Sequence, residues 1–249
     1  MSGHNRWSKI KRKKEAHGAA KGSLFTKLIR EITVAARTGG GDPAGNARLR
    51  TAIELAREAN MPAENVTRAI KKGTGELEGV HYEEATYEGY GPGGAALIVE
   101  CLTDNRNRTA GDVRTSFEKG GGNLAAPGAV EWSFDRRGVV EVKPGPTEDQ
   151  VTEAAIEAGA EEVVSLGADG FEVRTHPPDL HAVVDALRKT LPVGGSRIAL
   201  VPRETLRISD PEKAKALLRL VDLLEELDDV QRVHGNFDID EQVLAHLPG

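Results

Sequence analysis

The chain has 249 residues, 39% of them hydrophobic and 4% aromatic, and this composition predicts a globular protein of two or three domains. A single cysteine, Cys101, excludes a disulfide framework within the chain and favours a reducing compartment. The sequence shows no apolar run of about 18 residues and no secretory or mitochondrial leader, so we expect a cytoplasmic protein without a membrane partner.

The charge is divided unevenly along the chain, although the net charge is −6. Residues 1–80 contain 16 Lys and Arg against 8 Asp and Glu, a balance of +8. Residues 81–249 contain 17 against 31, a balance of −14. This asymmetry is typical of a basic nucleic-acid-binding domain attached to an acidic body.

The first 80 residues predict a basic arm followed by a three-helix bundle. Residues 1–20 have no stable apolar period. From Lys21 the residues Leu24, Leu28, Ile32 and Ala35 recur at helical spacing and are expected to face inward. Glycines and a proline at 39–43 end this helix, and a second is predicted at 46–59. A third begins at Pro62 and is closed by Gly73 and Gly75.

The pattern changes near residue 81, where strands and helices begin to alternate. Strands are predicted at 86–90, 95–102 and 130–134, with a helix at 106–119. The next segment has the order βαββαβ, which is typical of a ferredoxin-like domain. Its elements are expected at 139–142, 147–157, 162–166, 170–175, 178–190 and 197–202. A helix at 210–227 and a strand at 230–236 follow.

The strands and helix predicted within residues 81–136 are too few for a complete α/β sandwich. The last predicted helix and strand would complete it. We therefore expect a discontinuous middle domain, 81–136 plus 205–240, with the ferredoxin-like domain 137–204 inserted in it. The predicted fold class is α+β: an N-terminal helical bundle (1–80) and two α/β sandwich domains.

The arm and the first helix supply the main candidate binding residues. Clustered bases neutralise phosphates, and an aromatic ring among them can stack on an exposed base. The alternatives are a solvated tail without a partner, or an acidic membrane surface, for which the arm has few apolar anchors. The candidate residues are Arg6, Trp7, Lys9, Lys11, Arg12, Lys13, Lys14, His17, Lys21, Lys27 and Arg30.

A second candidate contact lies between a predicted strand and helix. Asn105, Arg106, Asn107 and Arg108 are polar, and two arginines in a first helical turn oppose the helix dipole. They could hold a phosphate or an acidic partner. The structural alternative is that Asp104 or Asn105 caps the helix. The glycines at 89–94 lead into a strand, so we expect a hairpin there and not a phosphate loop.

No arrangement of residues typical of catalysis appears in the sequence. The seven histidines are scattered, and neither a cysteine pair nor a zinc-protease motif is present. Cys101 falls in an apolar strand and is expected in the core. We therefore expect a non-catalytic protein with no metal, no cofactor and no small-molecule substrate.

Four segments together resemble the YebC family, which includes the mitochondrial translational activator of cytochrome oxidase. They are residues 3–7 (GHNRW), 25–31 (FTKLIRE), 87–94 (YEGYGPGG) and 104–109 (DNRNRT). The chain departs from the family pattern at Ala125, where glycine is usual, and at Ala129, where serine is common. The resemblance implies three domains, and it implies either a DNA-binding transcriptional regulator or a ribosome-associated factor for difficult sequences such as proline runs.

Three hypotheses follow for the function. The first is a translation factor that contacts ribosomal RNA, and ribosomal proteins through its acidic body; the arm with Trp7 suits RNA with unstacked bases. The second is a regulator that binds duplex DNA, although the glycine-rich connection at 38–45 is longer than a usual helix-turn-helix turn. The third is a protein-interaction adaptor. The sequence favours RNA.

Overall fold

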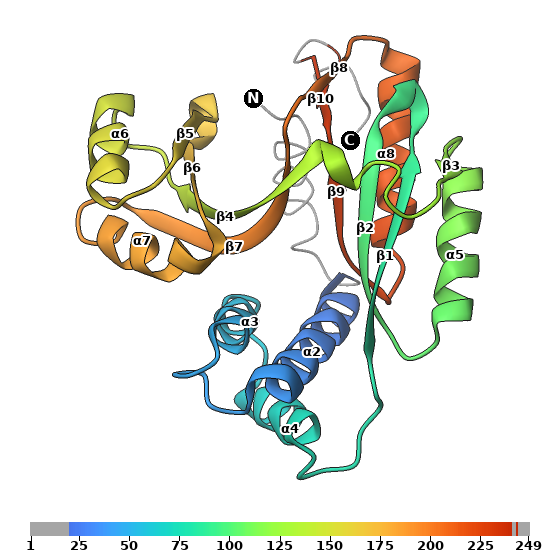
Figure 1. Cartoon of the computed structure of the whole chain (residues 1–249), viewed down its shortest axis with the longest axis horizontal. Helices are drawn as coiled ribbons and strands as arrows, with labels where there is room; N and C mark the ends of the chain where they lie inside the picture. The colour runs from blue at the N-terminus through green and yellow to red at the C-terminus, as the bar shows by residue number, and fades with distance from the viewer. Residues whose placement is uncertain (1–19, 241–242, 244–249) are drawn as a thin grey trace.

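The computed structural model describes residues 20–240 and residue 243. Its first unit is a bundle of three helices in which Leu28, Ile32, Leu49 and Ala56 are buried together. Leu24 was expected to face inward, but it is 45% exposed because its turn of the first helix extends toward the middle domain. The helices are α2 (Ala20–Gly39), α3 (Ala47–Glu58) and α4 (Ala63–Thr74) (Figure 1).

The middle domain is a four-stranded antiparallel sheet of order β3-β1-β2-β9, with two helices on one face. Leu97 and Val99 of the sheet pack with Phe117 and Leu220 of those helices. The pairing of β9 with β2 brings the end of the chain back into this sheet. The elements are β1 (Glu83–Tyr90), β2 (Ala96–Thr103), α5 (Arg106–Lys119), β3 (Asn123–Leu124), α8 (Pro211–Glu225) and β9 (Val230–Gly235).

The third domain has the strand order β5-β6-β4-β7, all antiparallel, which is the ferredoxin-like arrangement. Val140, Val173 and Phe171 of its sheet pack against Val151 and Val184 of the two helices. The elements are β4 (Phe134–Val142), α6 (Glu148–Glu157), β5 (Glu162–Ser165), β6 (Phe171–Thr175), α7 (Leu180–Leu187) and β7 (Val193–Pro202).

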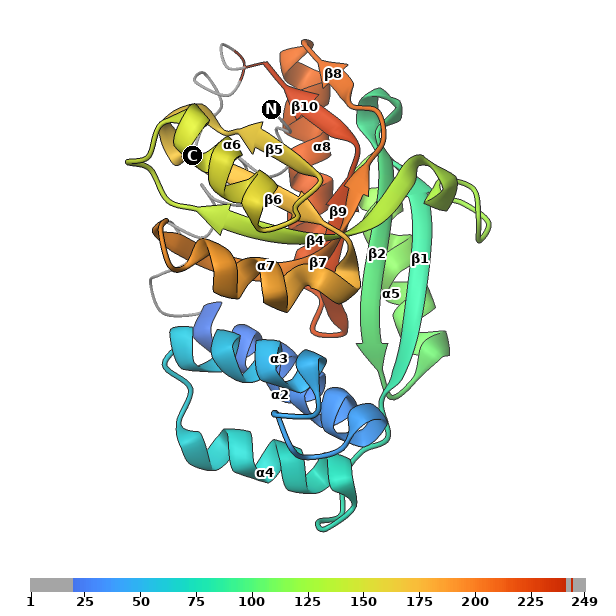
Figure 2. The same ribbon diagram turned by 60° about the vertical axis from the view of Figure 1, so that its left-hand side comes forward.

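The chain is thus an α+β protein in which a ferredoxin-like domain is inserted into the middle domain, with the bundle beside both (Figure 2). The chain enters the insertion along β4 and leaves it along β7, and these strands pair from Phe134↔Pro202 onward. The boundary expected between residues 136 and 137 therefore falls inside a continuous strand.

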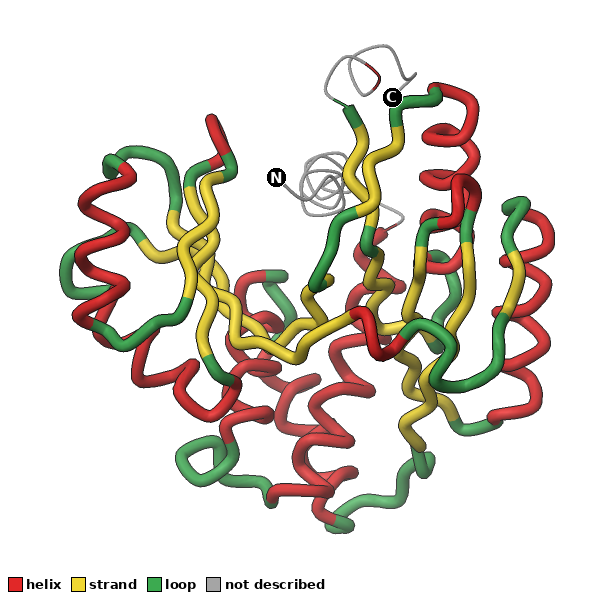
Figure 3. Tube along the Cα trace, turned by 45° about the horizontal axis from the view of Figure 1, so that its top comes forward, coloured by secondary structure: helices red, strands yellow, loops and turns green. Residues whose placement is uncertain are grey.

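One strand was predicted in the wrong place, and one short strand pair was not predicted. A strand was expected at 130–134, but Glu131–Ser133 form a 3-10 turn and the strand begins only at Phe134. Val130 and Phe134 instead pack on Ala96 and Ile98, covering the sheet face opposite α5 and α8. A short parallel pair, β8 (Leu206–Ile208) with β10 (Phe237–Ile239), was not predicted, because its strands are too short to show a period (Figure 3).

Of the helices formed by residues 20–240 and 243, none combines the length and the hydrophobicity needed to cross a bilayer.

Candidate functional site

Most of the predicted arm contacts lie outside the described residues. This applies to Arg6, Trp7, Lys9, Lys11, Arg12, Lys13, Lys14 and His17. Lys21 stands in the first turn of α2, and only its backbone is described.

Lys27 and Arg30 were expected to face nucleic acid, but both contact the middle domain. The Lys27 ammonium donates to the carbonyl oxygen of Glu225 at 2.6 Å. The Arg30 guanidinium donates to the Asp228 carbonyl at 2.6 Å and to the Asp229 carboxylate at 2.5 Å. With its side chain only 12% exposed, Arg30 has little surface left for a phosphate.

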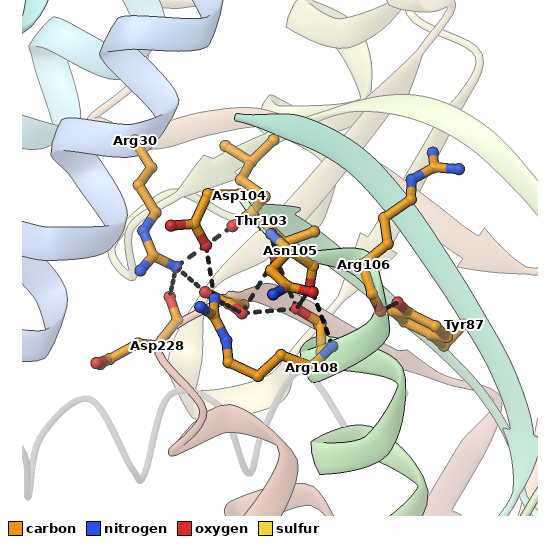
Figure 4. Close-up of polar contacts among 11 residues, drawn as sticks. Arg30, Tyr87, Thr103, Asp104, Asn105, Arg106, Arg108 and Asp228 are labelled. Carbon is orange, nitrogen blue, oxygen red and sulfur yellow. Dashed lines mark hydrogen bonds and ion pairs between the residues drawn. The ribbon is translucent and has the colours of Figure 1, made fainter. Parts of the chain in front are cut away.

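A polar cluster lies where the bundle meets the middle domain, and Figure 4 shows Arg30, Thr103 and Arg108 within it. The hydrogen bonds of these three side chains converge on Asp229. Its carboxylate is buried and accepts from Arg30, from Arg108 at 2.7 Å and from the Thr109 hydroxyl at 2.6 Å. The Thr103 hydroxyl lies 3.3 Å from the same oxygen as Thr109. Two segments distant in sequence, α2 and residues 103–109, therefore converge on the carboxylate of a third.

The electrostatics of this cluster keep Asp229 charged. Burial by itself would raise the pKa of Asp229, but the bonds from Arg108 and Thr109 and the charge of Arg30 outweigh it and hold the pKa below its ordinary value. A cavity of about 340 Å³ adjoins the cluster and is lined also by Asp104, Asp112, Leu227 and Asp228. Each described arginine in this lining already pairs with a carboxylate, so we assign no anion to the cavity.

In the second predicted contact, Asn105 caps a helix and the two arginines form three ion pairs. Asn105 caps α5, since its side chain accepts from the backbone N–H of Arg108 at 3.1 Å. Arg108 also pairs with Asp104, one turn back. Arg106 pairs with Glu83 at 3.1 Å, and these intramolecular acceptors explain two arginines at a helix N-terminus.

Carboxylates of the same chain thus pair with Arg106 and Arg108 in this structure, and a contact of these arginines with an external phosphate stays a prediction. Asn107 is exposed.

A second buried carboxylate, Glu88 of β1, was missed by the sequence analysis. It is 5% exposed and accepts from three backbone N–H groups, those of Gly128 (2.5 Å), Val130 (2.7 Å) and Glu131 (2.9 Å). Burial would raise the pKa of Glu88, but these three bonds hold it below its ordinary value. The available signal was a carboxylate within an otherwise uncharged run, 87–99.

The departures from the family pattern fall on this loop. Ala125 donates its backbone N–H to the Glu88 carbonyl at 2.8 Å, and the Ala129 carbonyl accepts from Tyr90 and Trp132. Both alanines contribute backbone groups that any residue other than proline supplies. The departures therefore leave these bonds intact.

The outer surface of the bundle retains exposed bases. Arg57 near the end of α3, and Lys71 and Lys72 near the end of α4, are exposed. The connection from α3 to α4 is only residues 59–62, with Asn60 in the left-handed region at φ 58°. This short turn was not predicted; the connection expected to matter was the longer one after α2.

Two family descriptions match the chain: "TACO1/YebC protein N-terminal domain" over residues 5–76 and "TACO1/YebC second and third domain" over residues 82–237. A "Probable transcriptional regulatory protein" of Myxococcus xanthus is 60% identical over 248 residues, 99% of each chain. A protein of the same description from Sulfurihydrogenibium sp. is 53% identical over the full length of both chains.

Among solved structures, a conserved hypothetical protein of Aquifex aeolicus is 49% identical and superposes with a TM-score of 0.83. The alignment covers 92% of this chain and 97% of that one. The matched models, the relatives and the shared three-domain architecture agree. The chain belongs to the YebC family.

Proposed function

We propose that this protein is a cytoplasmic, non-catalytic, nucleic-acid-binding regulator of gene expression that holds its target with the arm and the bundle. The observation that carries the proposal is the separation of charge: +8 in residues 1–80 against −14 in residues 81–249. A polyanion is attracted to the first part and repelled by the second. The exposed Arg57, Lys71 and Lys72 extend the basic surface beyond the arm.

The first candidate target is ribosomal RNA, in a factor that associates with the ribosome and aids translation of difficult, proline-rich sequences. The arm interleaves Trp7 with lysines and arginines, a composition suited to irregular RNA whose bases are unstacked. The acidic body would face the mostly basic ribosomal proteins. The YebC family includes a mitochondrial translational activator, and the chain's resemblance to that family supports ribosomal RNA as the target.

Duplex DNA is the second candidate, favoured by one feature of the bundle. Helices joined by a turn of about four residues are the basis of helix-turn-helix readers, and α3 and α4 are joined in this way. Thr67, Arg68 and Lys71 on α4 are exposed where a groove could receive them. The relatives' descriptions as transcriptional regulators also support DNA.

The test compares the wild type with a variant in which Lys11, Arg12, Lys13 and Lys14 are alanine. Binding to labelled RNA and to duplex DNA is followed by fluorescence anisotropy at several salt concentrations. The variant should bind both more weakly, with a salt dependence flatter by about 3 units of slope. A matched control, Lys213→Ala with Lys215→Ala on α8, removes exposed bases of the acidic body and should change little.

Sedimentation of a cell lysate, with and without nuclease, separates the candidates. Comigration with ribosomal particles that is lost at high salt supports the translation factor. Absence from those particles together with retention on duplex DNA supports transcription. Wild-type protein that binds neither nucleic acid would refute the proposal.

A further inference from the structure

Two aromatic rings beside the loop at 125–133 are exposed. Trp132 is 70% exposed and Tyr90 is 37% exposed. The Trp132 indole N–H donates to the Ala129 carbonyl at 3.0 Å, and the Tyr90 hydroxyl donates to the same oxygen at 3.2 Å. The only hydrogen-bond donor of the indole is thus satisfied within the chain. What Trp132 offers to a partner is a flat, apolar ring.

The loop that carries Trp132 is held in place before any partner arrives. Glu88 binds three of its backbone N–H groups, and Val130 is buried against the sheet. Ser133 donates its hydroxyl to the Val130 carbonyl at 2.7 Å, closing the turn. In Figure 1 this segment crosses from the β3 edge of the sheet to the start of β4. A ring fixed in this way loses little conformational freedom on binding.

Two chain segments next to the rings carry no charged residue. Residues 89–99 and 120–130 contain no Asp, Glu, Lys or Arg, and strand pairing places them together, Tyr90 opposite Asn123. The charged residues at the edge of these segments are the exposed Glu131 and the ion pair of Arg203 with Asp135, where the Arg203 backbone N–H donates to the Ser133 carbonyl at 2.9 Å. Elsewhere residues 81–249 are strongly acidic. This patch is therefore a place where a polyanion can approach the body without facing an excess of carboxylates.

We propose that Trp132 and Tyr90 form a stacking platform for an unpaired base of single-stranded nucleic acid, a second contact beyond the arm and the bundle. Stacking needs a flat ring and tolerates any base, and neighbouring segments without charged residues suit a neutral base whose phosphates lie to either side. The inference rests on the proposed function and deepens it, because it selects unpaired strands over duplex. An apolar protein partner is the competing occupant.

The chain contains two tryptophans, Trp7 and Trp132, so each can be observed alone. In the Trp7→Phe variant all tryptophan emission comes from Trp132, while phenylalanine keeps an aromatic ring on the arm. We expect short single-stranded RNA and single-stranded DNA to quench this emission, and duplex DNA of equal length to leave it unchanged. Comparing the quenching by RNA with the quenching by DNA shows which kind of single strand the protein binds.

Affinity gives the second measurement. Trp132→Ala should weaken binding of single strands by about tenfold and leave duplex affinity within about twofold, whereas Trp132→Phe should restore most of the loss. Ile156→Ala is the matched control, since Ile156 is also 70% exposed but lies on α6, and it should bind as the wild type does. Circular dichroism verifies that each variant is folded.

The outcomes separate this inference from the proposed function. If single strands bind the protein but Trp132 emission and Trp132→Ala affinity are unchanged, the platform is wrong and the arm proposal stands. If no nucleic acid binds at all, the proposed function itself fails. Quenching by ribosomal proteins but by neither single strand would overturn the base platform in favour of a protein contact.

Discussion

The guanidinium of Arg30 on α2 donates to the carboxylate of Asp229 at 2.5 Å, although 199 residues separate them. The same guanidinium lies 5.3 Å from the ring centroid of Tyr82, in cation–π geometry. The pair ties the basic bundle to the acidic middle domain. Of the two residues, Arg30 was expected to contact a phosphate; in this structure its charge pairs with a carboxylate of the middle domain.

Replacing Asp229 with asparagine should destabilise the protein by about 3 kcal/mol, since a buried ion pair that loses one partner leaves the other uncompensated. Arg30 and the Thr109 hydroxyl would both lose a charged acceptor. Urea unfolding followed by circular dichroism measures the change.

The control for this variant is Glu64→Gln, which removes the exposed pair with Arg68 on α4. We expect a change within about 0.5 kcal/mol, as is usual for surface pairs. Equal stability of Asp229→Asn and wild type would show that the Asp229 cluster is not what joins the two units.

Acid should destabilise the protein through Glu88 and Asp229. Both have a folded-state pKa below the ordinary value, so the unfolded chain binds more protons and stability rises with pH in that range. Their contribution is complete above the ordinary carboxyl pKa of about 4 and is lost as the pH falls through the lowered values. Urea unfolding at several pH values should give a flatter acid limb for Glu88→Gln with Asp229→Asn than for wild type. An unchanged slope would assign the acid sensitivity to other carboxylates.

Two helical glycines should respond to alanine with opposite signs. A Cβ at Gly73 of α4 would stand 2.4 Å from the Thr33 carbonyl and 2.7 Å from the Ala36 Cβ of α2, so Gly73→Ala must push the helices apart. A Cβ at Gly111 of α5 meets nothing within 4 Å, and Gly111→Ala should stabilise by up to about 1 kcal/mol. Thermal unfolding of the two variants compares them directly. A Gly73→Ala protein as stable as Gly111→Ala would mean that α2 and α4 pack less closely than described.

Cys101 should resist thiol reagents in the folded protein. It is 2% exposed on β2, and burial, followed by the charge of Asp229, raises the pKa of its thiol to about 12. Labelling should therefore be slow in buffer and complete in denaturant. Rapid labelling in buffer would indicate that β2 opens readily.

Helices and strands could be predicted where their sequence signals, such as caps and glycines, are adjacent to them. The helix Arg106–Lys119 was placed correctly because its cap, Asn105, and its terminating glycines are adjacent to it in sequence. The βαββαβ order likewise follows from periodicity and turn residues, which depend on near neighbours. The strand beginning at Phe134 was misplaced because Val130 is apolar for another reason, packing on the face of a different sheet.

By itself the sequence determined the α+β class, the inserted ferredoxin-like domain and the separation of charge, because patterning and composition are properties of the chain. Only the tertiary structure decided the partners of Arg30, Arg106 and Arg108, since a charge does not specify which distant carboxylate it will meet. It also decided that Glu88 is buried and Trp132 exposed. Those outcomes depend on how the loop between β3 and β4 folds back across the sheet, which no local signal encodes.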